Sequence, residues 1–260
     1  MTSTLPSIIC DQETLISLWK HECYRVIADR FIQQQDYDYF QSAMNRLLTE
    51  EFGEENSFTK TDDQCYFVDF LRDTPEVTGE EETEVEMPKI YEPVKSLEVL
   101  QERLTFLISL YNEVARTAHL DIVFFKDAVS HLTRISRIIR SPGGHALLVG
   151  VGGSGKQSLT KLAAFIAHYN TQQINLTRSY SATNFLEDLK ILYKSTGIQD
   201  KGTTFIFTDQ ALKDECFLEY LNNVLTCGVV SNLFNRDERA DIIAELTPMM
   251  KREQPRRPPT

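Results

Sequence analysis

The sequence predicts an α/β fold, a parallel sheet flanked by helices, that follows a mainly helical segment. From His145 onward, short apolar runs alternate with amphipathic stretches, which is typical of strand–helix–strand units with parallel strands. Before that point the apolar residues recur at helical spacing. A chain of 260 residues is long enough to bury a core.

The composition is that of a globular protein, with 42% hydrophobic and 25% charged residues. No apolar run approaches the roughly 18 residues of a membrane helix, and the N-terminus lacks the features of a secretory signal. We therefore expect no membrane partner. The net charge of −11 comes from one segment, Glu50 to Glu92, with fifteen acidic and three basic residues. This acidic balance argues against a nucleic-acid partner. The five cysteines have no metal-ligand spacing and are predicted to be reduced thiols.

The N-terminal part is predicted to be helical over residues 14–48, followed by a short buried strand over 66–71. His21, Glu22 and Arg25 nearly match a zinc-binding motif, but a cationic Arg25 cannot donate a lone pair, so we reject a zinc site. Residues 74–93 are acidic, contain three prolines and are predicted to be a linker. The first helix is expected to bury a stripe formed by Leu15, Leu18, Trp19, Val26 and Phe31.

Two further helices are expected between Ser96 and Arg140. The second carries Arg134, Arg137 and Arg140 opposite its apolar face, and these arginines are predicted to be solvated. Residues 141–144, SPGG, then break the chain.

The C-terminal part is predicted to hold three strands, over residues 146–151, 173–177 and 203–208. Helices are expected over 156–169, from Asn184 onward and over 214–227. The basic, proline-rich residues 251–260 are predicted to be disordered.

A glycine-rich loop lies between the first of these strands and the helix after it. Glycines let successive backbone N–H groups turn toward an anion, the helix start adds its positive end, and Lys156 supplies an ammonium for phosphates. The pattern predicts nucleotide binding; the alternative is a glycine-rich turn without a ligand. The predicted binding residues are Gly150, Val151, Gly152, Gly153, Ser154, Gly155, Lys156, Gln157 and Ser158.

The catalytic positions depart from this pattern. The residue after the lysine usually offers a hydroxyl to Mg²⁺, but here it is Gln157, and Ser158 comes one position late. Asp209, after the third strand, is the candidate metal and catalytic carboxylate, yet the neighbouring Gln210 cannot accept a proton. General-base catalysis contributes about 10² to 10⁴-fold, so we expect hydrolysis to be slow or absent.

Several segments together resemble the dynein heavy chains of outer axonemal arms. GVGGSGKQSL at 150–159, LTRSYSATNFLEDLK at 176–190 and TTFIFTDQ at 203–210 resemble the fourth AAA+ module of these motors. LWKHECYRVIADRF at 18–31 and YFVDFLRD at 66–73 resemble the helical lid of the third module. The resemblance covers nearly the whole chain, with its motifs in the same order.

The resemblance implies a P-loop NTPase fold of the AAA+ type, ATP or ADP as ligand with Mg²⁺ as its candidate partner, and Asp209 near the metal. It also implies a lid-like segment over 1–73, a linker over 74–93, a truncated AAA+ module over 94–250 and a tail over 251–260. Arg25 would correspond to a lid arginine. The expected partners are neighbouring AAA+ modules and dynein subunits, with microtubules reached only through the full-length motor, in the cytoskeleton of a ciliary axoneme.

An AAA+ sheet has five strands and the sequence offers three, so we expect an incomplete module from a partial chain, with an exposed sheet edge. Whether the chain is an enzyme stays open. Two hypotheses follow: a nucleotide-binding, regulatory segment of a ciliary motor, or a non-catalytic module that packs between its neighbours and keeps a vestigial loop.

Overall fold

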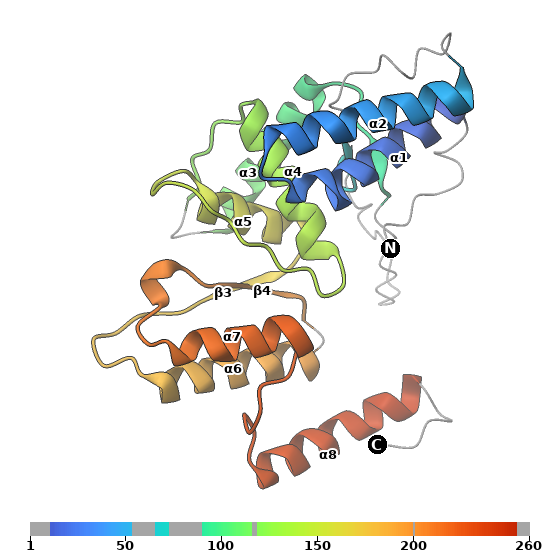
Figure 1. Ribbon diagram of the computed structural model, residues 1–260. Coiled ribbons are helices and arrows are strands. Elements are labelled where there is room, and N and C mark those ends of the chain that lie inside the picture. The colour runs from blue at the N-terminus through green and yellow to red at the C-terminus, as the bar shows by residue number, and fades with distance from the viewer. Residues whose placement is uncertain (1–10, 54–65, 73–89, 116–118, 200, 254–260) are drawn as a thin grey trace, which may run out of the picture. The chain divides into compact units, whose positions relative to one another are not determined.

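The computed structural model describes residues 11–53, 66–72, 90–115, 119–199 and 201–253 (Figure 1). The chain divides into two compact units, Met1–Ser141 and Pro142–Thr260. This division into compact units does not test the module boundary near residue 94 that the resemblance implies, and that boundary stays a prediction. Within the described ranges, no helix combines the length and apolarity needed to cross a bilayer.

The first unit is built from helices around one small antiparallel sheet. The predicted helix over 14–48 is two helices, because residues 27–33 interrupt it with a 3₁₀ turn. The antiparallel sheet of this unit pairs Phe67 with Pro93 and Val68 with Glu92. The elements are α1 (Gln12–Val26), η1 (Ala28–Arg30), α2 (Gln34–Phe52), β1 (Phe67–Val68), β2 (Glu92–Pro93), α3 (Leu97–Val114) and α4 (Lys126–Arg140).

The predicted buried face of α1 is wrong, because a neighbouring face of the helix is buried instead. Leu15 and Trp19 are 51% and 42% exposed, whereas Ile16 and Tyr24 are each only 4% exposed. Successive helical residues point about 100° apart, so two faces of α1 both carry apolar residues at helical spacing. Only a contact with another part of the chain decides which of these faces is buried. Tyr24 packs edge-on against Phe40 of α2, with ring centroids 5.4 Å apart, and this contact selects the second stripe.

Helices α3 and α4 confirm the prediction for residues 96–140. Ser96 caps α3 by accepting a hydrogen bond from the Val99 N–H, and Leu100 and Leu104 are fully buried. Val129 and Leu132 form the buried face of α4. Most of the predicted acidic linker lies outside the described residues, but its last residues contain β2 and the buried Tyr91.

The second unit holds a parallel pair of strands with helices packed against it. Gln173 pairs with Ile206 at one end of the sheet and Asn170 with Thr203 at the other. Helix α5 packs against both strands, and α6 packs against β4 and α7 (Figure 1). The elements are α5 (Lys156–Ile166), β3 (Asn170–Gln173), α6 (Ala182–Gly197), β4 (Thr203–Ile206), η3 (Asp209–Ala211), α7 (Cys216–Cys227) and α8 (Arg236–Glu253).

The core of this unit lies between α6, α7 and the segment that follows α7. Phe185 and Phe217 are fully buried and stack with ring centroids 4.6 Å apart. Val230 and Leu233, 4% and 5% exposed, extend the same cluster beyond the end of α7.

Three predictions for the second unit need correction. The expected strand at 146–151 is absent, and Leu147 and Val149 are 90% and 87% exposed. A strand needs neighbours for its backbone groups, and the described sheet has only two strands. The strand expected at 173–177 ends at Gln173, since the pairing with β4 sets its position. Helix α8 extends into the predicted disordered tail as far as residue 253, and 254–260 lie outside the described residues.

Candidate functional site

The glycine-rich loop closes around the ammonium of Lys156. Nζ donates to the carbonyl oxygens of Gly150 and Val151, each at 2.7 Å, and to Oγ of Ser154 at 3.1 Å. A lysine ammonium has three donors, and this loop uses all three. The positive charge is therefore held at the centre of the loop by the residues that the sequence predicts to bind phosphate.

Two glycines give the loop its turn. Gly153 and Gly155 have φ angles of +77° and +79°, in the left-handed region that side chains with a Cβ rarely adopt. Gly155 is also the N-cap residue of α5, so the helix begins directly at Lys156.

The start of α5, directly after the loop, provides further hydrogen-bond donors. The Leu159 N–H donates to the Gly155 carbonyl at 2.9 Å and is the first such bond of the helix. The N–H groups of residues 156–158 precede it and have no acceptor within the helix. Free N–H groups and the positive end of the helix dipole favour an anion at this position.

Gln157 connects the helix start to the sheet. Its Oε1 accepts a hydrogen bond of 3.5 Å from Nε2 of Gln173, at the end of β3. Gln173 is not among the predicted site residues, because the second strand was expected to begin rather than end there. This contact brings the start of α5 to the edge where both parallel strands end.

Asp209 follows β4 beyond the same edge. It opens the 3₁₀ turn η3 with an exposed side chain, and its carbonyl accepts the Leu212 N–H at 3.1 Å. The strand pairing and the Gln157–Gln173 contact thus place Asp209 and the start of α5 at the end of the sheet where β3 and β4 both finish. Among the described residues, no three His, Cys, Asp or Glu side chains gather as they would to hold a metal ion.

The helix predicted to start at Asn184 begins earlier, at Ala182. Ser181 is the N-cap of α6, and Asn184 is the third residue of its capping box: Asn184 Oδ1 accepts from the Ser181 N–H at 3.0 Å. Tyr180, just before the cap, donates to Asp188, and burial together with this contact raises the pKa of the Tyr180 hydroxyl. This packing fixes the segment between β3 and α6.

The arginines of α4, predicted to be solvated, instead pair with carboxylates. Arg137 and Arg140 donate to Glu22 of α1 and to Asp69, and Arg134 lies 3.4 Å from Asp29 of η1. Helical periodicity did not predict these ion pairs, since it identifies the polar face of a helix but not the residues that lie opposite that face. All three ion pairs belong to the first unit and involve none of the residues predicted to bind nucleotide.

Arg25, the residue that the resemblance gives as a lid arginine, shares this network. It lies 3.4 Å from Asp29, which therefore bridges Arg25 and Arg134. Burial raises the pKa of Asp29, while the two arginines act against this shift. Glu22, the second residue of the rejected zinc motif, accepts from Arg137 and from the hydroxyl of Tyr91.

Comparison with known proteins identifies similar sequences over the whole chain. Residues 120–258 match the family described as the P-loop containing dynein motor region D4. The chain is 58% identical over its full length to dynein axonemal heavy chain 5 of Rattus norvegicus, of which it covers 8%. It is 55% identical over 95% of its length to dynein axonemal heavy chain 8 of Homo sapiens, covering 6% of that protein.

A more distant relative comes from an alga. The chain is 39% identical over 88% of its length to the dynein alpha chain of the flagellar outer arm of Chlamydomonas reinhardtii, of which it covers 5%. The chain thus spans less than a tenth of the length of these relatives.

Proposed function

The chain belongs to the axonemal dynein heavy chain family, and from that premise we propose that it is a nucleotide-binding AAA+ segment of a ciliary or flagellar motor. The observation that carries the proposal is the loop around Lys156, which leads directly into α5, where the N–H groups of residues 156–158 have no acceptor within the helix. Both features attract an anion, and their spacing along the chain suits a polyphosphate. The ligand that fits is ATP or ADP.

In this proposal the residues of the loop have separate roles. On binding, Lys156 would exchange its hydrogen bonds to the loop for contacts with the phosphates, and the N–H groups of residues 153–158 would surround them. Gln157, Ser158 and Asp209 are the candidate Mg²⁺ contacts, with Gln157 oriented by Gln173.

A regulatory role fits the chain better than the main hydrolysis role. Gln210 cannot act as a base, and the exposed Asp209 has a short side chain. Without a positioned base, cleavage of a bound nucleotide would be slow, so the loop would retain the nucleotide uncleaved. A retained nucleotide changes which conformation of a module is favoured without a rapid chemical step.

We also propose the setting of this segment. Residues 1–73 would form the lid of the preceding module, 74–93 a linker and 94–250 part of an AAA+ module whose parallel sheet includes β3 and β4. Neighbouring modules and dynein subunits would be its direct partners, microtubules would be contacted through the full motor, and the location would be the axoneme.

One observation favours a second function, a structural module with a vestigial loop. Residues 146–151 lie outside the sheet, and Val151 within the loop is 79% exposed. A loop that lacks a supporting strand is less ordered before nucleotide binds, and ordering it costs affinity.

Titration of the chain with a fluorescent ADP or ATP analogue separates the two functions. We expect micromolar binding by the wild-type chain and a loss of at least tenfold in Lys156→Ala, since the ammonium is the central charge of the loop. Lys161→Ala is the matched control, because it removes an equal charge from the same helix outside the loop and should bind like wild type. Equal binding by wild type and Lys156→Ala, or no binding by either, would favour the structural module.

A further inference from the structure

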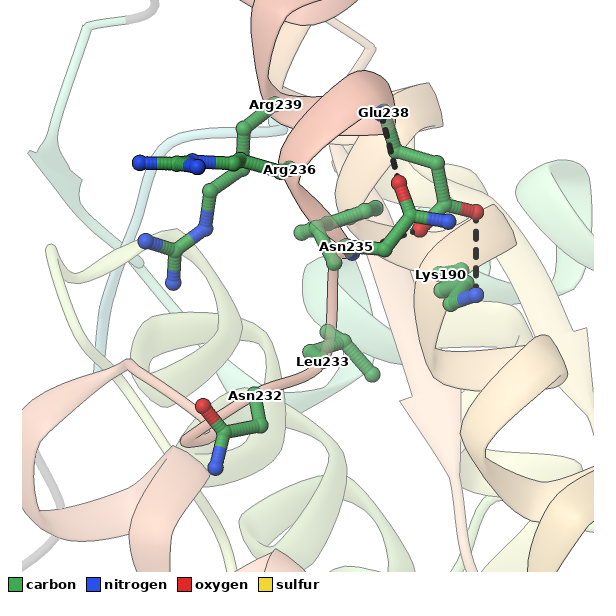
Figure 2. A pocket seen from close by; sticks show the side chains of 8 residues that line it. Lys190, Asn232, Leu233, Asn235, Arg236, Glu238 and Arg239 are labelled. Atoms are coloured by element: carbon green, nitrogen blue, oxygen red, sulfur yellow. Dashed lines mark hydrogen bonds and ion pairs between the residues drawn. The ribbon is translucent and has the colours of Figure 1, made fainter.

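A cavity of about 490 Å³ lies in the second unit, away from the glycine-rich loop (Figure 2). It is lined by Lys190 of α6, by residues 232–235 just before α8, and by Arg236, Glu238 and Arg239 in the first turn of α8. Its size is within the range of sites that hold a small ligand or part of a peptide. None of its residues belongs to the predicted nucleotide site.

The wall of this cavity is fixed by a capping box at the start of α8. The Glu238 N–H donates to Oδ1 of Asn235, and the Asn235 N–H donates to Oε2 of Glu238, each at 2.8 Å. Lys190 joins α6 to this box, with Nζ at 3.0 Å from Oε1 of Glu238. Each carboxylate oxygen of Glu238 therefore already has a donor.

The floor of the cavity belongs to the core. Leu233 is 5% exposed and packs in the cluster around Phe185 and Phe217. Phe234 stands edge-on to Tyr193 of α6, with ring centroids 6.5 Å apart, and the Tyr193 hydroxyl donates to the Gly228 carbonyl at 2.8 Å. The site is thus held in shape by packing and needs little ordering when it binds.

Two guanidinium groups at the cavity form no ion pair with any residue that the structure describes. Arg236 and Arg239 lie on the side of the helix start opposite Lys190 and Glu238 (Figure 2). Among the described residues, neither forms a salt bridge, whereas the α4 arginines of the first unit all pair with carboxylates. The two charges are three residues apart on one helix and repel each other until an anion neutralises them.

We propose that this cavity is a docking site for an acidic peptide segment of a partner protein. Guanidinium groups bind carboxylates through paired hydrogen bonds, and two of them suit two successive acidic side chains. The Asn232 amide offers further hydrogen bonds, and the ring of Phe234 offers an apolar contact for the backbone or side chain between them. The proposal is independent of the nucleotide-binding function.

The overall charge of the chain makes the test selective. The chain as a whole carries −11 and the same helix start holds Asp237 and Glu238, so binding of a polyanion depends directly on the two arginines. The probe is a labelled octaglutamate peptide at low salt, with octaglutamine as the neutral control. We expect octaglutamate alone to bind, a loss of at least tenfold in the double variant Arg236→Gln/Arg239→Gln, and weaker binding as salt is raised.

Arg178→Gln, which removes an exposed arginine of the same unit away from the cavity, is the matched control and should bind like wild type. Circular dichroism of the double variant checks its fold, which two exposed substitutions should leave intact. The proposal is overturned if wild type fails to bind octaglutamate, or if Arg178→Gln loses as much as the double variant. Displacement of the peptide by inorganic phosphate at equal charge concentration would also overturn it, in favour of a phosphate site.

Discussion

Glu22 of α1 accepts an ion-pair hydrogen bond from Arg137 of α4, two residues that are 115 positions apart in the chain. The same carboxylate accepts the hydroxyl of Tyr91 at 3.1 Å, beside the small sheet. Burial, and then the charge of Glu22, raise the pKa of Tyr91, so its hydroxyl keeps its proton and remains a donor. One carboxylate thus joins three separate segments of the first unit.

Loss of this carboxylate is expected to destabilise the first unit. The Arg137 side chain is only 20% exposed, so Glu22→Ala leaves a half-buried cation unpaired, at a cost of about 1–3 kcal/mol. Urea unfolding followed by the fluorescence of Trp19, the only tryptophan, measures this unit. The control Glu50→Ala breaks an exposed pair with Arg46 of 3.8 Å and should cost less than about 1 kcal/mol. Equal costs for the two variants would contradict a stabilising role for the Glu22–Arg137 ion pair.

Neighbouring residues of α1 should differ sharply in their contribution to stability. Ile16 is 4% exposed and Leu15 is 51% exposed, although either could be buried by the sequence pattern alone. We expect Ile16→Ala to cost about 2–5 kcal/mol and Leu15→Ala less than about 1 kcal/mol, again by urea unfolding. The reverse order would mean that the sequence-based stripe is the buried one.

Sequence patterns predicted the helices better than the sheets. The spacing of Leu100 and Leu104, or of Val129 and Leu132, follows the helical period and needs no other part of the chain. The strands depend on what lies beside them, so the apolar run around Leu147 and Val149 predicted a buried strand that the described sheet does not contain.

Leu147 should therefore contribute little to the stability of this chain. Its side chain is 90% exposed, so Leu147→Ser is expected to change the free energy of unfolding by no more than about 0.5 kcal/mol. Leu162→Ala, at a fully buried position of α5, is the comparison and should cost about 2–5 kcal/mol. Thermal unfolding by circular dichroism measures both. A large loss in Leu147→Ser would show that the run pairs as a strand in solution.

The residues of the loop were predictable from sequence, whereas their environment was not. Glycine spacing located Gly153, Gly155 and Lys156, since φ angles and helix starts are local properties. The Gln173 contact with Gln157 depends on where β3 ends, and that is set by pairing with β4.

Nucleotide binding by this loop is expected to depend only weakly on Mg²⁺. Gln157 offers an amide oxygen that already accepts from Gln173, in place of a free hydroxyl. Removing Mg²⁺ with a chelator should weaken ADP binding by less than about threefold, or about 0.7 kcal/mol. Gln157→Thr supplies the hydroxyl and should increase that dependence, while Gln157→Asn keeps an amide and should not. Loss of binding by wild type in chelator would refute the weak dependence.

Glu238 should stabilise the start of α8 in a pH-dependent way. The hydrogen bond from the Asn235 N–H, and then the ammonium of Lys190, hold the pKa of Glu238 below its ordinary value of 4.5. A lowered pKa means that the fold favours the charged carboxylate. Its stabilising effect is therefore fully present above pH 4.5 and is lost as the pH falls through the lower pKa of the folded state.

Hydrogen exchange of the backbone amides in residues 235–240 is the measurement for this effect, in wild type and in Glu238→Gln. Glutamine can still accept from Asn235 but carries no charge for Lys190, so wild type should be the better protected at neutral pH. The difference should shrink as the pH is lowered toward about 3, once the change in intrinsic exchange rate is removed. Glu245→Gln, at an exposed position of the same helix, is the control and should match wild type at neutral pH. If the Glu238→Gln difference stays constant down to that pH, the charge of Glu238 does not anchor α8 to α6.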